Sequence, residues 1–306
     1  MIKSKGTDSA IEMVEEQVWQ LHKAGFEIGL HLHPQWYNAR REEGSWVLDY
    51  SEYNLCTLKR ERIEWMVDKG IEYLRRILKQ PGFTPVSFRA GNWLLQPSHK
   101  AAAVLAEKGI RVDSSVFKGG LQRGRGLDYR PALRNGDYWN FQDDVNKETP
   151  GGRLLEIPIY TRLVPFWRMF TGKRLALQQK ASTVAQKTAQ PSLRQRVSRV
   201  SDLLRLRYPL KFDFCRMTLD ELTTAVDGMI EEDKKTPACL KPLVAIGHTK
   251  DLKDYQTIVT FLAYLKEKRI KVSTLEEVYD RCRVPTSRAI PNNRAMPSDL
   301  ETVAAD

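Results

Sequence analysis

Cysteine is scarce in this sequence and never occurs in closely spaced pairs. Four cysteines are spread over 306 residues, at positions 56, 215, 239 and 282, and none belongs to a CxxC motif. A disulfide framework and a thiolate zinc site are therefore not expected, and reduced thiols fit a cytoplasmic protein.

Long apolar runs are also missing. No stretch has the length of a membrane span, and the first residues, Met1-Ile2-Lys3-Ser4-Lys5, lead into no signal-peptide core. The sequence has neither an internal repeat nor a GxxxxGK[ST] loop, which excludes a solenoid and a P-loop phosphate site. Its 42% hydrophobic and 28% charged residues are typical of a soluble globular protein. We therefore expect a soluble protein in the cytoplasm.

Acidic residues are outnumbered by basic ones. There are 38 Asp and Glu against 49 Lys and Arg, which gives a net charge of +11. Residues 173–207 hold nine Lys and Arg but one acid, Asp202, so this helix-prone segment carries 9 − 1 = 8 of that charge. It is either a basic amphipathic helix that binds an anionic membrane surface or a solvated helical face. Nucleic acid is not an expected partner, because no nucleic-acid-binding motif is present.

Two of the five histidines flank a single leucine, Leu32, after an apolar segment, 26–30, that predicts a short strand. Side chains alternate in an extended chain, so His31 and His33 point the same way, about 6–7 Å apart. Two such imidazoles can converge on one metal ion, and Pro34 ends the strand directly after them. The alternative is an edge strand with a polar face that carries two histidines by chance.

Strands and helices alternate along the rest of the chain. A helical period of apolar residues predicts a long helix from about Leu58 to Leu78, whereas residues 37–54 show no period and are predicted to form a loop. Further predicted strands are 85–89, 110–113, 154–159 and 243–248, and Thr218 and Thr274 are predicted helix caps. This order predicts an α/β protein with a mainly parallel sheet and its functional residues at the strand C-termini.

The strand-end residues, in this order, resemble those of polysaccharide deacetylases (NodB homology domain, carbohydrate esterase family 4), and more narrowly a WalW-like branch associated with lipopolysaccharide and other surface polysaccharides. The matching segments are Glu27-Ile28-Gly29-Leu30-His31-Leu32-His33-Pro34, Phe88-Arg89-Ala90-Gly91-Asn92-Trp93, Gly109-Ile110-Arg111-Val112-Asp113-Ser114-Ser115, Leu155-Glu156-Ile157-Pro158 and Ala245-Ile246-Gly247-His248-Thr249. The resemblance implies a distorted (β/α) barrel over residues 1–284, interrupted by the basic helical insertion 173–207. The polar, Pro- and Asn-rich composition of residues 285–306 predicts a disordered tail.

The same resemblance implies an activity, the metal-dependent removal of N- or O-acetyl groups from sugars. It assigns His31 and His33 to a divalent metal, for which zinc is the expected ion. Arg89 matches the arginine that steadies the catalytic carboxylate, and Asp113 matches the aspartate that tunes the acid histidine. That histidine corresponds to His248, which would protonate the leaving group. From the sequence alone, Arg89 and His248 are also compatible with structural roles.

The family opens with a strand that ends in a sequence like Thr-Phe-Asp-Asp, and this chain has only eight residues before Ser9. Three interpretations follow: an N-terminally shortened chain that lacks the first strands, carboxylates borrowed from elsewhere, or a degenerate relative. The expected function is therefore a metal-dependent hydrolase that removes an acyl group from an amino sugar or polysaccharide precursor. The alternative is an inactive carbohydrate-binding or scaffolding relative.

Three further residues are candidates for contact with a sugar. Trp36 and Trp93 follow predicted strand ends and could stack on sugar rings, although aromatic residues at such places equally belong to a core. Glu156 lies in a predicted strand, where it could face the cavity or act as a pairing partner of another side chain.

Overall fold

A five-stranded sheet forms the centre of the computed structural model, which describes residues 9–133, 137–169, 172, 207–237 and 240–283. Its strands lie in the order β1-β4-β5-β9-β8. The first four pair in parallel and β8 is antiparallel to β9. Their bounds are β1 Leu30–Leu32, β4 Ser87–Ala90, β5 Val112–Asp113, β9 Leu154–Glu156 and β8 Trp139–Phe141. The mixed α/β class with parallel strands is thus confirmed, while closure into a barrel stays a prediction.

Isolated parallel bridges extend this arrangement beyond β9. Ile159 pairs with Phe117 on one side and with Val244 on the other, and Asp213 pairs with Ile246. These bridges bring the segment that ends at His248 alongside the residues after β9. β10, Thr161–Pro165, follows Ile159 in the chain and forms a separate antiparallel pair with β11, Arg207–Lys211, which precedes Asp213.

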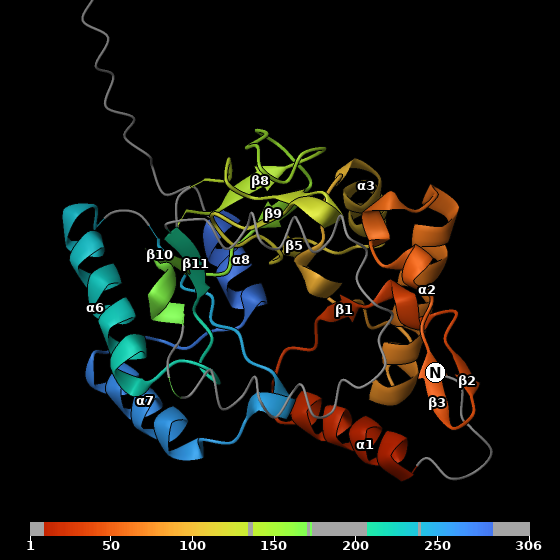
Figure 1. Ribbon diagram of the computed structural model, residues 1–306, viewed down its shortest axis with the longest axis horizontal. Coiled ribbons are helices and arrows are strands. Elements are labelled where there is room, and N and C mark those ends of the chain that lie inside the picture. The colour runs from red at the N-terminus through yellow and green to blue at the C-terminus, as the bar shows by residue number, and fades with distance from the viewer. Residues whose placement is uncertain (1–8, 134–136, 170–171, 173–206, 238–239, 284–306) are drawn as a thin grey trace, which may run out of the picture.

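Helices flank the sheet on opposite sides of the molecule (Figure 1). The helix α2, Arg60–Leu78, packs against α1, Ser9–Lys23, and α3, His99–Glu107. Its buried residues include all six apolar positions of the predicted helical face, which confirms that prediction: Ile63, Met66, Val67, Ile71, Leu74 and Leu78. They pack into one core with the apolar residues of β1 and β4.

On the other side α6, Leu219–Lys235, packs against α7, Tyr255–Glu267, whereas α8, Leu275–Arg283, packs against β5. The predicted cap of α6 is confirmed, since the side chain of Thr218 accepts from the Glu221 amide and the Glu221 carboxylate accepts from the Thr218 amide. None of the helices in the described ranges is long and apolar enough to cross a membrane.

The segment after β1 is more ordered than its sequence predicts. Instead of a plain loop it contains a hairpin of β2, Arg40–Glu42, and β3, Ser45–Val47, with Glu43 and Gly44 at positive φ in the turn. All six strand residues are exposed, so no alternation of apolar and polar residues marks the hairpin in the sequence.

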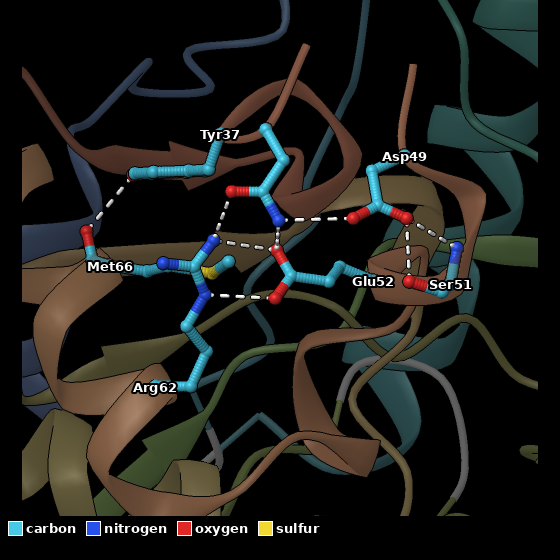
Figure 2. Close-up of polar contacts among 7 residues, drawn as sticks. Tyr37, Asp49, Ser51, Glu52, Arg62 and Met66 are labelled. Carbon is cyan, nitrogen blue, oxygen red and sulfur yellow. Dashed lines mark hydrogen bonds and ion pairs between the residues drawn. The ribbon is translucent and has the colours of Figure 1, made fainter.

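A polar network fastens this segment to α2 (Figure 2). Arg62 binds the Glu52 carboxylate with two nitrogens, each 2.8 Å from an oxygen, and also donates to the side chain of Asn38. Asn38 in turn donates to Asp49 and Glu52, while the hydroxyl of Tyr37 donates to the Met66 carbonyl at 2.9 Å. The network fixes the chain on both sides of the hairpin. The short 3₁₀ turn Pro34–Trp36, which follows the two histidines, is thereby held in place.

Candidate functional site

The imidazoles of His31 and His33 meet at the C-terminal end of β1. Their Nε2 atoms lie 3.1 Å apart, and the rings are nearly perpendicular with centroids at 4.7 Å. Two ligand nitrogens that each lie about 2.0–2.1 Å from one zinc ion are about 2.9–3.4 Å apart, depending on the angle at the metal. The pair therefore has the spacing of two ligands on one ion.

A backbone carbonyl fixes the orientation of the His31 ring. The Nδ1 atom of His31 lies 2.8 Å from the carbonyl oxygen of Arg89, which can only accept, so Nδ1 carries the proton. In the neutral ring the lone pair is then on Nε2, the atom that faces His33. A hydrogen bond from the second ring nitrogen to a carbonyl is the usual support of a metal-binding histidine.

His248 lies close enough to both histidines to act on them electrostatically. Burial is the main cause that lowers the pKa of His31, and burial together with the charges of His31, His248 and Lys250 lowers the pKa of His33 to about 4. His248 also contributes to the shift of the His31 pKa. The structure thus places His248 within electrostatic range of the pair, and both members of the pair are neutral at pH 7.

The environment of His248 includes an aspartate that the sequence interpretation did not identify. Burial lowers the pKa of His248, and the charge of Asp213 opposes this shift most strongly. Asp213 is buried, accepts from the Cys215 amide at 3.0 Å and lies 3.7 Å from Arg216. The Nδ1 atom of His248 is enclosed and has no hydrogen-bond partner among the described residues.

Half-buried Arg89 and the buried residues Asp113 and Glu156 form a cluster on neighbouring strands. Asp113 and Glu156 are directly paired in the register of β5 and β9, and neither has any exposed surface. Arg89 donates to the carbonyl and the hydroxyl of Ser114 at 2.8 and 3.1 Å. Its charge acts on both carboxyl groups. The structure therefore assembles these three predicted residues, but it leaves no exposed atom of Glu156 for a sugar to contact.

Both carboxyl groups have raised pKa values, because both are buried. Burial and the charge of Asp113 raise the pKa of Glu156 well above its usual value, so Glu156 keeps its proton and its carboxyl group lies within hydrogen-bonding reach of Asp113. Asp113 accepts from the amide and hydroxyl of Ser115 at 2.9 and 2.8 Å. Glu156 accepts from the Val116 amide at 3.1 Å.

We expect Glu156→Gln to gain stability over the wild type as the pH rises. The pKa of Glu156 is higher in the folded state than the 4.5 of an unperturbed glutamate, so its favourable contribution is complete below pH 4.5 and is lost as the pH rises through the folded pKa. The amide of glutamine keeps a donor for Asp113 without titrating. Between those two pKa values the wild type should lose about 1.4 kcal/mol per pH unit relative to the variant. Urea unfolding of both proteins from pH 5 to 8 measures this difference. A difference in the free energy of unfolding that stays constant with pH would contradict the prediction.

The two tryptophans have different surroundings. Trp36 is 49% exposed and packs edge-to-face against Trp46, which is also exposed, with ring centroids 6.2 Å apart. Trp93 is half-buried and packs against Phe117, and the ammonium group of Lys211 lies 4.0 Å from its ring centroid. Burial lowers the pKa of this lysine to about 8. Trp36 therefore has an open face for a ligand, whereas Trp93 belongs largely to the core.

The described part of the chain contains no group of three or more His, Cys, Asp and Glu side chains that could together hold a metal ion. The basic segment 173–206 and the tail from residue 284 lie outside the described residues. A membrane-binding surface at the first and disorder in the second therefore stay predictions. Comparisons with protein-family models, with characterised proteins and with solved structures find no match to this chain.

Proposed function

We propose that this protein is a metal-dependent hydrolase that removes an acetyl or other acyl group from an amino sugar or a polysaccharide precursor. The observation that carries the proposal is the 3.1 Å separation of the two Nε2 atoms, with the Nδ1 proton of His31 bound to the Arg89 carbonyl. A divalent cation at this point, for which zinc is the expected ion, would polarise an acyl carbonyl and activate water for attack.

The residues of the chain would divide the remaining tasks. His248 would deliver a proton to the leaving nitrogen or oxygen, and because its pKa is lowered it must first take one up. Asp213 would stabilise the resulting imidazolium, since its carboxylate acts on His248. Trp36 offers an exposed aromatic face to a sugar ring three residues after His33.

A non-catalytic carbohydrate-binding or scaffolding protein is the second candidate. It is favoured by the small ligand set, because the described residues place two imidazoles together without a third metal-binding side chain. A site of this kind would hold a metal weakly, and exposed Trp36 and Trp46 would still be available to a sugar.

Acetate release separates the two candidates. The purified chain with Zn²⁺ is expected to release acetate from N-acetylglucosamine oligosaccharides, and His248→Gln is expected to lower that rate by about 100-fold or more, because general acid catalysis contributes about 10²–10⁴. Zinc uptake, measured by calorimetry, should be unchanged in this variant. His99→Gln, at the start of α3, is the matched control and should keep full activity.

Oligosaccharide binding without acetate release would support the second candidate. A fully active His248→Gln variant would remove His248 from the proposed mechanism.

A further inference from the structure

The side chain of Gln35 lies beside the His33 ring, at its Nδ1 atom. Gln35 belongs to the turn Pro34–Trp36 and its side chain is almost fully enclosed, with 6% of the residue exposed. Its backbone carbonyl accepts from the Asp49 amide at 3.1 Å, which ties it to the polar network of Figure 2. Its amide nitrogen lies 3.5 Å from Nδ1 of His33, whereas its Oε1 atom is buried without a partner among the described residues.

The hydrogen bonds of the two imidazoles connect the Gln35 amide to the two Nε2 atoms. His31 donates from Nδ1 to the Arg89 carbonyl, so its Nε2 carries a lone pair. His33 must then donate from Nε2 across the 3.1 Å contact, and its Nδ1 accepts from the Gln35 amide. In this arrangement one lone pair faces one proton, and the point between the two Nε2 atoms cannot accept a cation.

Turning the Gln35 amide by half a turn changes the tautomer of His33. The side-chain carbonyl then accepts from Nδ1–H of His33, and the lone pair of His33 moves to Nε2. Both Nε2 lone pairs now face the same point, which is unfavourable unless a cation lies there. The outer end of the amide makes no hydrogen bond with any described residue, so only the contact with His33 sets its orientation.

The chain at Gly91 runs close to Nδ1 of His33 and has no room for a side chain. A Cβ atom at Gly91 would lie 3.0 Å from Nδ1 of His33 and 2.3 Å from the carbonyl oxygen of Leu32. Glycine is therefore required there, and it offers His33 no side-chain partner. Among the described residues, Gln35 supplies the hydrogen-bonding side chain at this nitrogen.

We propose that Gln35 is a positioning residue of the cation site, whose side-chain carbonyl accepts from Nδ1–H of His33 and so directs the Nε2 lone pair toward the ion. This inference rests on the proposed function, because it assumes that His31 and His33 share a cation. It adds that the site exists in two hydrogen-bonded states, and that Zn²⁺ selects the state in which Gln35 is the acceptor.

Two substitutions of similar size test this role through zinc affinity, measured by calorimetry on the full chain. Gln35→Met removes the acceptor and should weaken Zn²⁺ binding by about 10–100-fold, the usual effect of losing such a partner. Gln35→Glu can only accept from His33 and should bind at least as tightly as the wild type. A merely structural role would weaken both variants alike.

A spectroscopic readout on the wild type needs no substitution. In ¹⁵N NMR spectra of the imidazole nitrogens, Zn²⁺ should move the proton of His33 from Nε2 to Nδ1, while His31 keeps its proton on Nδ1. Unchanged affinity in Gln35→Met, equal losses in both variants, or a zinc-bound His33 protonated on Nε2 would each overturn the role of Gln35 alone. Failure of the wild type to bind Zn²⁺ would instead overturn the cation site on which the proposed function depends.

Discussion

The wild-type protein is expected to bind Zn²⁺, and the double variant His31→Ala/His33→Ala to lose this binding to the detection limit of calorimetry. The reason is geometric, since the two Nε2 atoms lie 3.1 Å apart and the His31 ring is held by the Arg89 carbonyl at 2.8 Å. Removal of both imidazoles takes away both nitrogen ligands of the proposed site. The effect should be the largest of any substitution in the protein on metal uptake.

The control is His22→Ala/His99→Ala, which removes the same number of imidazoles from the first helix and the start of α3. This variant should bind Zn²⁺ as the wild type does. If zinc uptake persists in the His31/His33 variant at the same stoichiometry, the ion binds elsewhere and the candidate site is not a metal centre.

The sequence predicts this part of the molecule well because local rules apply to it. Alternation along a strand places His31 and His33 on one side, and the structure brings them into contact. The parallel order of strands likewise predicts that Arg89 lies near the histidines, and the register of β1 and β4 pairs it with His31. The apolar period of α2 and the cap at Thr218 are confirmed for the same reason.

Features that depend on contacts between distant segments are not predictable in this way. Asp213 acts on His248 because an isolated bridge aligns it with Ile246, and no pattern in the sequence indicates that pairing. The role proposed for Gln35 depends on its contact with Nδ1 of His33 and on a buried Oε1 atom without a partner among the described residues, and no sequence pattern indicates either. The hairpin of β2 and β3 escapes prediction because all its side chains face solvent.

The cluster of Arg89, Asp113 and Glu156 also affects the stability of the fold. Asp113 and Glu156 have no exposed surface, and the charge of Arg89 favours the ionised form of Asp113. The guanidinium itself is held by two hydrogen bonds to Ser114. Since a buried carboxylate without a compensating cation is strongly unfavourable, Arg89 should contribute to folding as well as to the position of His31.

Arg89→Met is therefore expected to lower the free energy of unfolding by about 2 kcal/mol at pH 8, within the roughly 1–3 kcal/mol that a buried polar group left without its partner costs. Burial already raises the pKa of Asp113, and removal of the cation raises it further. A raised folded-state pKa means that stability is lost as the pH rises, so the deficit of the variant should be smaller at pH 5. Urea unfolding at both pH values measures it.

Two comparisons make the Arg89→Met prediction specific. Arg60→Met breaks an exposed ion pair with Glu107 and should cost at most about 1 kcal/mol at either pH, because surface pairs contribute little. Adding Asp113→Asn to Arg89→Met removes the buried charge and should restore much of the lost stability at pH 8, since asparagine can still accept from the Ser115 amide. A deficit that is independent of pH and unaffected by Asp113→Asn would show that Arg89 acts through packing, and the electrostatic account of the cluster would be wrong.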